Sequence, residues 1–372
     1  MTEESKLFKD VFFKPGFIKE LAGALAYAMP GFDKKVFEKN VFDKDWQHKE
    51  LKQRTRHIVL VLHALLPKDF PVAVKVILKT IEHLRTQGIK EVSFGYMALP
   101  EYIEVYGLEH YKESVQAMEY ITQFMSCEFA VRPFIIKYDA KMMKQMLAWS
   151  KHKDPKVRRL SSEGCRPRLP WAIALPAYKK DPAPILPILE NLKADEDVWV
   201  RKSVANNLND ISKDSPELAI KIFKSWLGKD KHTDWIVKHA ARTLLKAGNK
   251  EVMALFGFKK ESGVKLQHLA VETPKVKMGK DLVFSFSIHN TGKQPKTIRL
   301  EYAMHYLRAN GSHSKKVFKI SEKEYKPGTS TNITRKQSFK PITTRVYYPG
   351  RHRVSVIVNG HEEAVADFDL VT

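Results

Sequence analysis

The sequence is poor in cysteine and lacks any long apolar run. It holds only two cysteines, Cys127 and Cys165, and neither belongs to a CxxC pair or another metal-ligand spacing. We therefore expect two free, semi-buried thiols in a reducing compartment and no disulfide framework. No apolar stretch approaches the roughly 20 residues of a membrane-spanning helix, and the acidic residues 1–5 have no signal-peptide pattern. Both absences favour a cytoplasmic protein without a membrane partner.

Motifs for metal, nucleotide and covalent chemistry are missing as well. The 14 histidines form no HExxH pair or other ligand set, and the chain has neither a phosphate-binding loop nor a GxGxxG pattern. No lysine stands in a setting that would desolvate it, as a Schiff-base mechanism requires. We expect no metal and no cofactor.

Acidic residues are scarce relative to basic ones. The chain has 64 Lys and Arg against 42 Asp and Glu, a formal net charge of +22 with a pI of about 9.7. Such an excess favours polyanions, nucleic acid before an anionic membrane surface. Residues 261–372 hold 19 basic and 10 acidic residues, a net charge of +9, and the first 260 residues hold the other +13. Two folded basic bodies fit this distribution better than one domain with a charged arm.

Residues 1–260 show helical periodicity throughout. The clearest apolar helix patterns cover residues 12–29, 56–66, 71–84, 98–106 and 111–128. The stretches that begin at Asp154, Asp197 and Thr233 resemble one another, and their central valines lie 43 and 37 residues apart. Because HEAT and armadillo units span roughly 40–47 residues, we predict an α-solenoid of HEAT-like repeats. Each repeat should open with an acidic turn residue, and the second helices should line one concave face. Trp199 and Trp235 occupy matching positions, where we expect packing roles.

From about residue 264 the pattern changes to the alternation of β-strands. Apolar residues occupy alternate positions in residues 282–288 and again in residues 354–358. Turn signals such as Asn310-Gly311 and Pro349-Gly350 separate about seven short strands. The sequence therefore predicts an all-β immunoglobulin-like sandwich over residues 264–372, without the paired cysteines of antibody domains. It would follow a helical domain over residues 1–260.

An unusual mixture of residues lies where the first repeat helix ends. Residues 162–171 contain one carboxylate, two arginines, two prolines and one tryptophan. Arg159, Glu163 and Arg166 share one face of a helix expected over residues 155–166. An ion-pair stripe on the surface would explain that spacing alone, since such pairs are common and contribute little. A functional site is favoured because this helix should line the concave face, two prolines splay the chain after it, and Trp171 follows.

The same motif carries a family resemblance. Ser162-Glu-Gly-Cys-Arg-Pro-Arg-Leu-Pro-Trp-Ala172 resembles the signature of the AlkC family of bacterial alkylpurine DNA glycosylases. Glu128-Phe-Ala-Val-Arg-Pro-Phe134 and Asn206-Asn-Leu-Asn-Asp210 are similar to two further family motifs. The resemblance covers most of residues 1–260, and the β-rich remainder is similar to the immunoglobulin-like extension of one AlkC subgroup.

The resemblance implies removal of small cationic methylated bases from double-stranded DNA, 3-methyladenine and 3-methylcytosine above all, in base excision repair of alkylation damage. It also implies, through the related AlkD proteins, cleavage without flipping the base, a departure from the usual route of base-processing enzymes. A base methylated at N3 is already cationic and leaves readily, so no strong general acid is needed. The remaining tasks are to stabilise an oxocarbenium-like sugar and to direct a water at C1′, and ionised carboxylates suit both.

Four residues are candidates for this chemistry. Glu163, Glu128 and Asp210 can supply the carboxylates, and the residues leave open which of them positions the water. Neighbouring arginines favour the ionised form of Glu163, and Trp171 can place its π-face against the cationic base or the sugar. Without the family match, Glu128 would be interpreted as a surface acid, Asp210 as a helix-end residue and Trp171 as part of the core.

Basic residues of the same repeats are candidates for DNA contacts. Arg159 and Arg166 can hold flanking phosphates bidentately, and the further candidates are Arg168, Arg201 and Lys202. Together these features predict a monomeric, monofunctional glycosylase that acts on duplex DNA containing alkylated bases. One alternative is a non-catalytic HEAT-repeat scaffold that binds nucleic acid or an acidic protein. Another is an AlkD-like preference for bulkier adducts such as 7-methylguanine.

Overall fold

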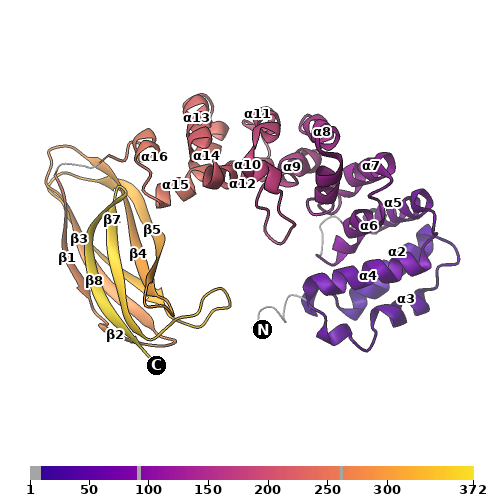
Figure 1. The fold of residues 1–372 in the computed structure, drawn as a ribbon, viewed down its shortest axis with the longest axis horizontal. Coiled ribbons are helices and arrows are strands. Elements are labelled where there is room, and N and C mark those ends of the chain that lie inside the picture. The colour runs from indigo at the N-terminus through magenta and orange to yellow at the C-terminus, as the bar shows by residue number, and fades with distance from the viewer. Residues whose placement is uncertain (1–9, 90–93, 260–262) are drawn as a thin grey trace. The chain divides into compact units, whose positions relative to one another are not determined.

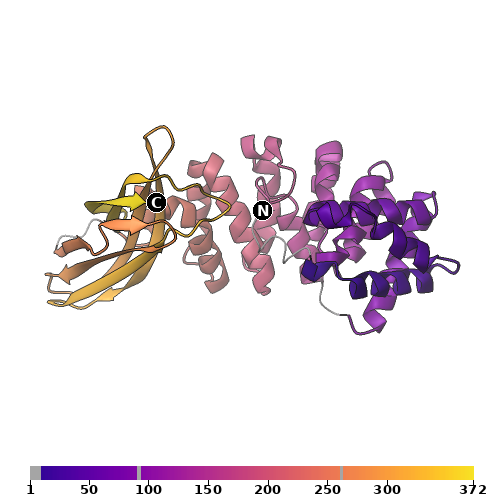
Figure 2. The ribbon, with the colours of Figure 1, turned by 90° about the horizontal axis from the view of Figure 1, so that it is seen from below.

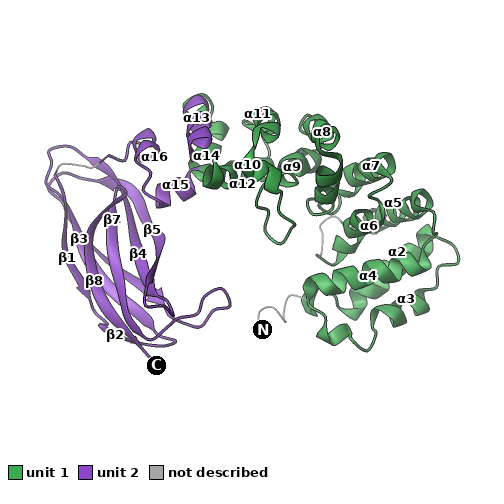
Figure 3. Ribbon diagram, in the orientation of Figure 1, with its two compact units in different colours: residues 1–215, 226–240 green, residues 216–225, 241–372 purple. Residues whose placement is uncertain are grey.

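The chain folds into two compact units. The computed structural model describes residues 10–89, 94–259 and 263–372. One unit comprises Met1–Ser215 with Trp226–Ala240, and the other comprises Pro216–Ser225 with Ala241–Thr372 (Figure 3). The described part of the first unit is helical, whereas the second joins helices to a β-sandwich (Figure 1). The predicted fold class, HEAT-like helical repeats followed by an immunoglobulin-like sandwich, is confirmed. The domain boundary placed between residues 260 and 264 stays a prediction.

The helices of the first unit follow one another in sequence order along the unit (Figures 1 and 2). Their bounds are α2 (Pro15–Ala28), α3 (Lys34–Val41), α4 (Leu51–Leu65), α5 (Phe70–Thr86), α6 (Ala98–Tyr106), α7 (Tyr111–Ile121), α8 (Val131–Trp149), α9 (Pro155–Glu163), α10 (Pro176–Lys180), α11 (Leu186–Leu192), α12 (Val198–Asp214) and α14 (Lys231–Ala240). Short 3-10 turns occur at Trp46–His48, Phe94–Met97 and Ala183–Ile185.

Local capping explains where these helices begin. The Asp69 carboxylate accepts a hydrogen bond from the Val72 amide at 3.0 Å at the start of α5, and the Gln53 side chain accepts one from the Glu50 amide at 2.7 Å at the start of α4. Both contacts satisfy amides that lack a partner within the helix. Among the residues described, no single helix is long and apolar enough to cross a membrane, but α4 and α5 taken together, bent by 117°, pass that test by length and composition.

Two of the predicted repeats match in atomic detail. Asp154 caps α9 and Asp197 caps α12, and each accepts from an amide two residues ahead. Arg158 and Arg201, four residues after their caps, each donate from Nη1 to the carbonyls five and six residues before them. Helices α9, α12 and α14 lie on the concave side of the first unit (Figure 3), and α12 packs against both of the others. The repeat helices therefore line one face, as the sequence predicts.

The third repeat has a different register from the predicted one. Asp234 was expected to open this copy, but it lies inside α14. The opening residue is Asp230, whose carboxylate accepts from the amides of His232 and Thr233 at 2.8 and 3.1 Å. Alignment on the valines predicts Asn206 and Thr243 as the equivalents of Glu163, whereas counting from the three capping aspartates gives Asn206 and His239. A carboxylate still occupies this position in the first repeat alone.

The second unit contains a two-sheet sandwich. The strands are β1 (Val264–Val271), β2 (Lys275–Lys277), β3 (Asp281–Asn290), β4 (Lys296–Leu307), β5 (His313–Tyr325), β6 (Ser330–Ser338), β7 (Gly350–Val358) and β8 (His361–Val371). One sheet has the order β1-β3-β6 and the other β2-β8-β7-β4-β5. All pairs are antiparallel except β2 with β8. The buried faces of both sheets share one apolar core.

Three helices of the second unit accompany the sandwich. They are α13 (Pro216–Trp226, of which Trp226 is grouped with the first unit), α15 (Arg242–Lys246) and α16 (Lys250–Leu255). The turn after α15 approaches the β7–β8 turn closely, since a Cβ on Gly248 would lie 3.0 Å from the Gly360 carbonyl oxygen. Asn359 also donates to the carbonyl of Lys259 at 2.9 Å. Residues on both sides of the predicted boundary therefore belong to one compact unit.

A buried histidine should make the second unit sensitive to acid. His352 is fully buried on β7, its Nδ1 accepts from the Leu307 amide at 3.2 Å, and its Nε2 lies 2.9 Å from the Tyr348 carbonyl oxygen. Burial lowers the pKa of His352 from its usual value, so the unfolded chain takes up this proton at a higher pH than the folded one. The stabilisation is complete above about pH 6.5, the unfolded pKa, and is lost as the pH falls from there through the lower pKa of the folded state.

We expect the free energy of unfolding to fall by up to about 1.4 kcal/mol per pH unit below about pH 6.5 from this residue. Thermal unfolding at a series of pH values measures it. His352→Gln keeps a donor and an acceptor but does not titrate, so its acid sensitivity should be smaller. Equal acid sensitivity of the two proteins would contradict the assignment.

Candidate active site

Glu163 is the last helical residue of α9. The helix was expected to run to Arg166, but it ends three residues earlier because Gly164 caps it and Arg166 precedes Pro167, a position that disfavours helix. Gly164 also lets α9 approach α8 closely, since a Cβ at this position would lie 2.5 Å from Val131 Cγ1. The end of α9 is therefore held tightly, and Glu163 is buried there.

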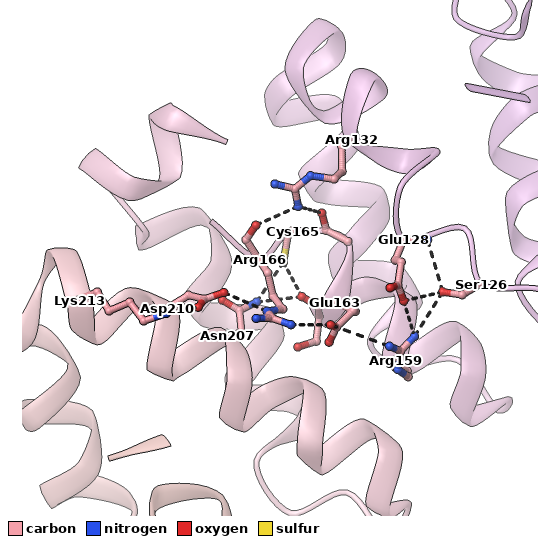
Figure 4. Close-up of polar contacts among 12 residues, drawn as sticks. Ser126, Glu128, Arg132, Arg159, Glu163, Cys165, Arg166, Asn207, Asp210 and Lys213 are labelled. Atoms are coloured by element: carbon pink, nitrogen blue, oxygen red, sulfur yellow. Dashed lines mark hydrogen bonds and ion pairs between the residues drawn. The ribbon is translucent and has the colours of Figure 1, made fainter. Parts of the chain in front are cut away.

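Arg166 joins two carboxylates from different helices (Figure 4). Its Nη1 donates to Glu163 Oε1 at 2.6 Å, and its Nε donates to Asp210 Oδ2 at 2.9 Å. The second carboxylate oxygen of Asp210 accepts from Lys213 Nζ at 3.0 Å. Glu163 and Asp210 are thus brought together from α9 and α12, 47 positions apart in the sequence. Glu163, Arg166 and Asp210 are all buried.

Arg159 extends the network to the third predicted carboxylate. Its Nη1 donates to Glu128 Oε2 at 2.7 Å, and its Nη2 lies 3.9 Å from Glu163 Oε1. Ser126 Oγ donates to the same Glu128 oxygen at 2.8 Å. Acidic and basic groups therefore alternate from Glu128 to Lys213 across three segments of the chain (Figure 4). The structure brings Glu128, Glu163 and Asp210 into one network.

The carboxylates of this network stabilise the charged forms of its two arginines, Arg159 and Arg166. Burial by itself would lower the pKa of Arg159 and of Arg166, but Glu128 and Glu163 beside the first, and Glu163 and Asp210 beside the second, outweigh burial and raise both pKa values. Cys165 lies next to the network and takes no part in it as a thiolate, because burial raises its pKa to about 12. Cys127 and Cys165 are both free, as predicted, but fully buried rather than semi-buried.

Trp171 is not a core residue. Its side chain is 67% exposed, its backbone has a φ of +64°, and it lies in the irregular segment between α9 and α10. The Lys52 ammonium donates to the Trp171 carbonyl at 2.8 Å, and the Phe94 ring meets the indole edge-on with 6.4 Å between centroids. The Lys52 ammonium also lies 5.7 Å from the centre of the Phe129 ring, beside Glu128. Local contacts thus hold the loop while the indole faces solvent.

Arg132, which was not predicted from the sequence, anchors this loop by hydrogen bonds to its backbone carbonyls. Arg132 is the second residue of α8 and is fully buried. Its Nε donates to the Ile173 carbonyl at 2.6 Å, and its Nη1 donates to the carbonyls of Gly164 and Arg166 at 2.8 and 2.9 Å. Burial lowers its pKa to about 10, well above neutral pH. The only sequence signal was its place in the Glu128–Phe134 motif.

The predicted DNA-binding residues already have protein partners. Arg159 and Arg166 donate to the carboxylates described above, and the Arg168 Nε donates to Asp214 Oδ2 at 2.9 Å. Arg201 donates to two carbonyls of its repeat turn, and the Lys202 ammonium lies 4.5 Å from the centre of the Trp199 ring. These contacts suit positioning roles for Arg159 and Arg166. Phosphate binding by the five residues stays a prediction.

The expected packing roles of two tryptophans are wrong. Trp199 is 62% exposed and Trp235 is 39% exposed. Trp199 is the second residue of α12, whereas Trp235 lies in the middle of α14. Within the described ranges, no three His, Cys, Asp or Glu side chains stand close enough together to hold a metal ion.

Comparison with known proteins extends over almost the whole chain. A family described as "Uncharacterised protein YhaZ, C-terminal Ig-like domain" matches residues 265–372. The uncharacterized protein YhaZ of Bacillus subtilis (strain 168) is 44% identical over 353 residues, which cover 95% of this chain and 96% of that protein. The solved structure of Pseudomonas fluorescens alkylpurine DNA glycosylase AlkC, bound to DNA containing an abasic site analog, superimposes with a TM-score of 0.91 at 35% identity. That match covers 98% of this chain and 99% of the other.

Proposed function

The chain belongs to the AlkC family, and from this premise we propose that it is an alkylpurine DNA glycosylase that removes cationic N3-methylated bases. The observation that carries the proposal is the meeting of Glu163 with Asp210 through Arg166, where the segment that carries the exposed Trp171 begins. The related AlkC was solved with DNA, and a net charge of +22 suits the same partner here. We infer that the protein acts on duplex DNA in the cytoplasm, as a monomer.

The proposed chemistry needs no general acid and depends on carboxylates that stabilise the sugar. A base methylated at N3 carries a positive charge and leaves as a neutral molecule when the C1′–N bond breaks, so no group of the protein has to protonate it. The sugar then gains oxocarbenium character, and the carboxylates of Glu163 and Asp210 stabilise that charge. One of them, or Glu128, orients the water whose oxygen forms the new bond to C1′ and accepts its proton.

Arg166 is a positioning residue in this scheme. By donating to both Glu163 and Asp210 it fixes their separation. It engages only Oε1 of Glu163, so Oε2 can face the sugar, whereas Asp210, whose other oxygen accepts from Lys213, contributes its charge. Trp171 presents a π-face that attracts positive charge, on the edge of the cationic base or on the sugar as it gains oxocarbenium character. Excision without base flipping is part of the proposal, because the Trp171 indole stands out from the surface and can meet the base edge or the sugar of a nucleotide that stays in the helix.

Monofunctional hydrolysis is part of the same proposal. A coupled lyase step would need a lysine that attacks C1′ as a neutral amine. Lys213, which is close to the carboxylates, is an ion-pair partner of Asp210 at 3.0 Å. Its ammonium is held by a carboxylate in this pair, so water is the better nucleophile.

The proposal is tested by the bases that the full chain releases from methylated duplex DNA. We expect 3-methyladenine and 3-methylcytosine in the supernatant, identified by mass spectrometry, and an intact abasic strand as the other product. Release of more 7-methylguanine than of these two bases would indicate the AlkD-like preference instead. A non-catalytic scaffold would bind the DNA and release no base.

The sandwich is proposed to bind DNA as well, because residues 261–372 carry a net charge of +9. Exposed lysines on β5 include Lys316 and Lys323, and β6 carries Arg335 and Lys336. Replacing each pair with glutamine should lower the slope of log affinity against log salt by about 1 for every phosphate that the pair neutralises. If neither replacement changes the slope, these two faces of the sandwich do not bind DNA.

A further inference from the structure

Two exposed tryptophans on neighbouring helices have no role in the proposed glycosylase site. Trp199 and Trp235 come from adjacent repeat helices, α12 and α14, which pack against each other. Exposed indoles are costly because a large apolar face remains in water. Trp46, Trp149 and Trp226, by contrast, are buried. The exposure of Trp199 and Trp235 therefore calls for a ligand.

Each of these indoles has a cationic or ionisable neighbour. The Lys202 ammonium lies 4.5 Å from the centre of the Trp199 ring, within the range of a cation–π contact. The imidazole of His239 stacks on Trp235 with 5.2 Å between centroids and 4° between planes. A basic side chain beside an aromatic face is the combination by which proteins hold a nucleic-acid strand, one group for the phosphate and the other for the base.

The surface continues into the candidate active site along one face of α12. At 100° per residue, Lys202, Asp210 and Lys213 all lie within about 60° of Trp199 around the helix axis. The rise along α12 from Trp199 to Asp210 is roughly 16 Å, which is the length of a few nucleotides. A strand that crosses the carboxylates can therefore also reach Trp199, and Trp235 lies on the helix that packs against α12.

An indole face binds unstacked bases in preference to the bases of an intact duplex. In an intact duplex the faces of the bases are hidden in the stack, and only phosphates, sugars and groove edges are accessible. An indole gains stacking energy only from bases that have left the stack. In cytosine methylated at N3, the methyl group blocks the nitrogen that accepts a hydrogen bond from guanine. Unpaired nucleotides therefore accompany this proposed substrate.

From these observations we propose that Trp199 and Trp235, with Lys202, bind unpaired nucleotides of a DNA strand next to the lesion. The inference rests on the proposed function for the identity of the lesion, but the binding itself does not require base release. The surface would let the protein work on lesions in single-stranded or locally opened DNA. Its ligand class is a single DNA strand with accessible base faces.

The test compares two probes of equal charge, oligo(dT) and an oligomer of the same length made only of abasic sites. The full chain should bind oligo(dT) more tightly, and its tryptophan fluorescence should be quenched by oligo(dT) alone. The double variant Trp199→Ala/Trp235→Ala should bind oligo(dT) about 10-fold more weakly or worse. Its affinity for the abasic oligomer should stay within about 2-fold, because the groups that bind phosphate are unchanged.

Tyr27→Ala is the matched control, since Tyr27 is also 65% exposed and stacks on a histidine, His83, but lies on α2. It should bind both probes like the parent. The proposal is overturned if the double variant keeps its oligo(dT) affinity, or if its affinity falls equally for both probes. Base release from methylated duplex, measured separately, shows whether the proposed glycosylase function has failed instead.

Discussion

Replacing Glu163 with glutamine is expected to slow single-turnover base release by about 100- to 1,000-fold, the effect of removing one charge-stabilising group from a preorganised site. Glutamine has the same shape and can still accept from Arg166, so the end of α9 should keep its structure. What disappears is the negative charge that faces the developing oxocarbenium ion. The measurement is the rate of release of 3-methyladenine with enzyme in excess over DNA.

DNA binding should survive this substitution. Removing a negative charge from a basic surface favours a polyanion, so the affinity for methylated or abasic DNA should stay level or rise. Glu196→Gln is a matched control, because Glu196 is an exposed carboxylate of the same unit, and its rate should equal that of the parent. If Glu163→Gln keeps a rate within about 10-fold of the parent, another carboxylate carries the charge. Asp210→Asn and Glu128→Gln would then identify it.

Much of the candidate site could be predicted because its signals are local. Glu163 and Trp171 lie in one short motif of unusual composition, and the helix before them shows the spacing of a repeat. The β-sandwich was visible from alternation alone, since Leu282, Phe284, Phe286 and Ile288 are all buried on β3. Periodicity reports which face of an element is buried, and here it did so correctly.

The partners of the arginines could not be predicted, because they depend on how helices stack. Arg166 meets Asp210 only when α9 and α12 lie side by side at the right height. From sequence, an exposed arginine and a buried one look alike, and phosphate binding was the natural expectation for both Arg159 and Arg166. Arg132 was missed for a related reason, since its acceptors are backbone carbonyls, which no side-chain pattern reveals.

Errors in the third repeat and at the tryptophans share one cause, which is that residue type alone does not fix a position in the fold. The sequence prediction aligned the second and third repeats on Val200 and Val237. The structural register is instead set by the capping aspartates, Asp197 and Asp230. A shift of four residues along a helix keeps nearly the same face, so the helix itself was still placed correctly. Exposure of Trp199 and Trp235 could not be inferred from residue type, because tryptophan is usually buried.

Arg132→Met should be the most damaging substitution for the loop that carries Trp171. Methionine fills much of the space but leaves the carbonyls of Gly164, Arg166 and Ile173 buried without their donor. Unsatisfied buried acceptors of this kind cost about 3 kcal/mol or more in total. For a unit of this size we expect the melting temperature to fall by roughly 6–12 °C, which differential scanning calorimetry can measure.

Arg132→Met should slow base release even at temperatures at which the protein is still folded. Arg132 holds the chain on both sides of the prolines, so without it the Trp171 loop and the end of α9 lose their fixed relation even while the helices remain intact. Base release well below the melting temperature should therefore fall by about 10-fold or more, as happens when catalytic groups are misplaced. Arg158→Met is the matched control, because Arg158 also donates to two carbonyls and to Asp195, but those carbonyls precede α9 and belong to His152 and Lys153. It should lower stability and leave the rate at low temperature unchanged, and an equal fall in rate in both variants would mean that general destabilisation, not the loop, is responsible.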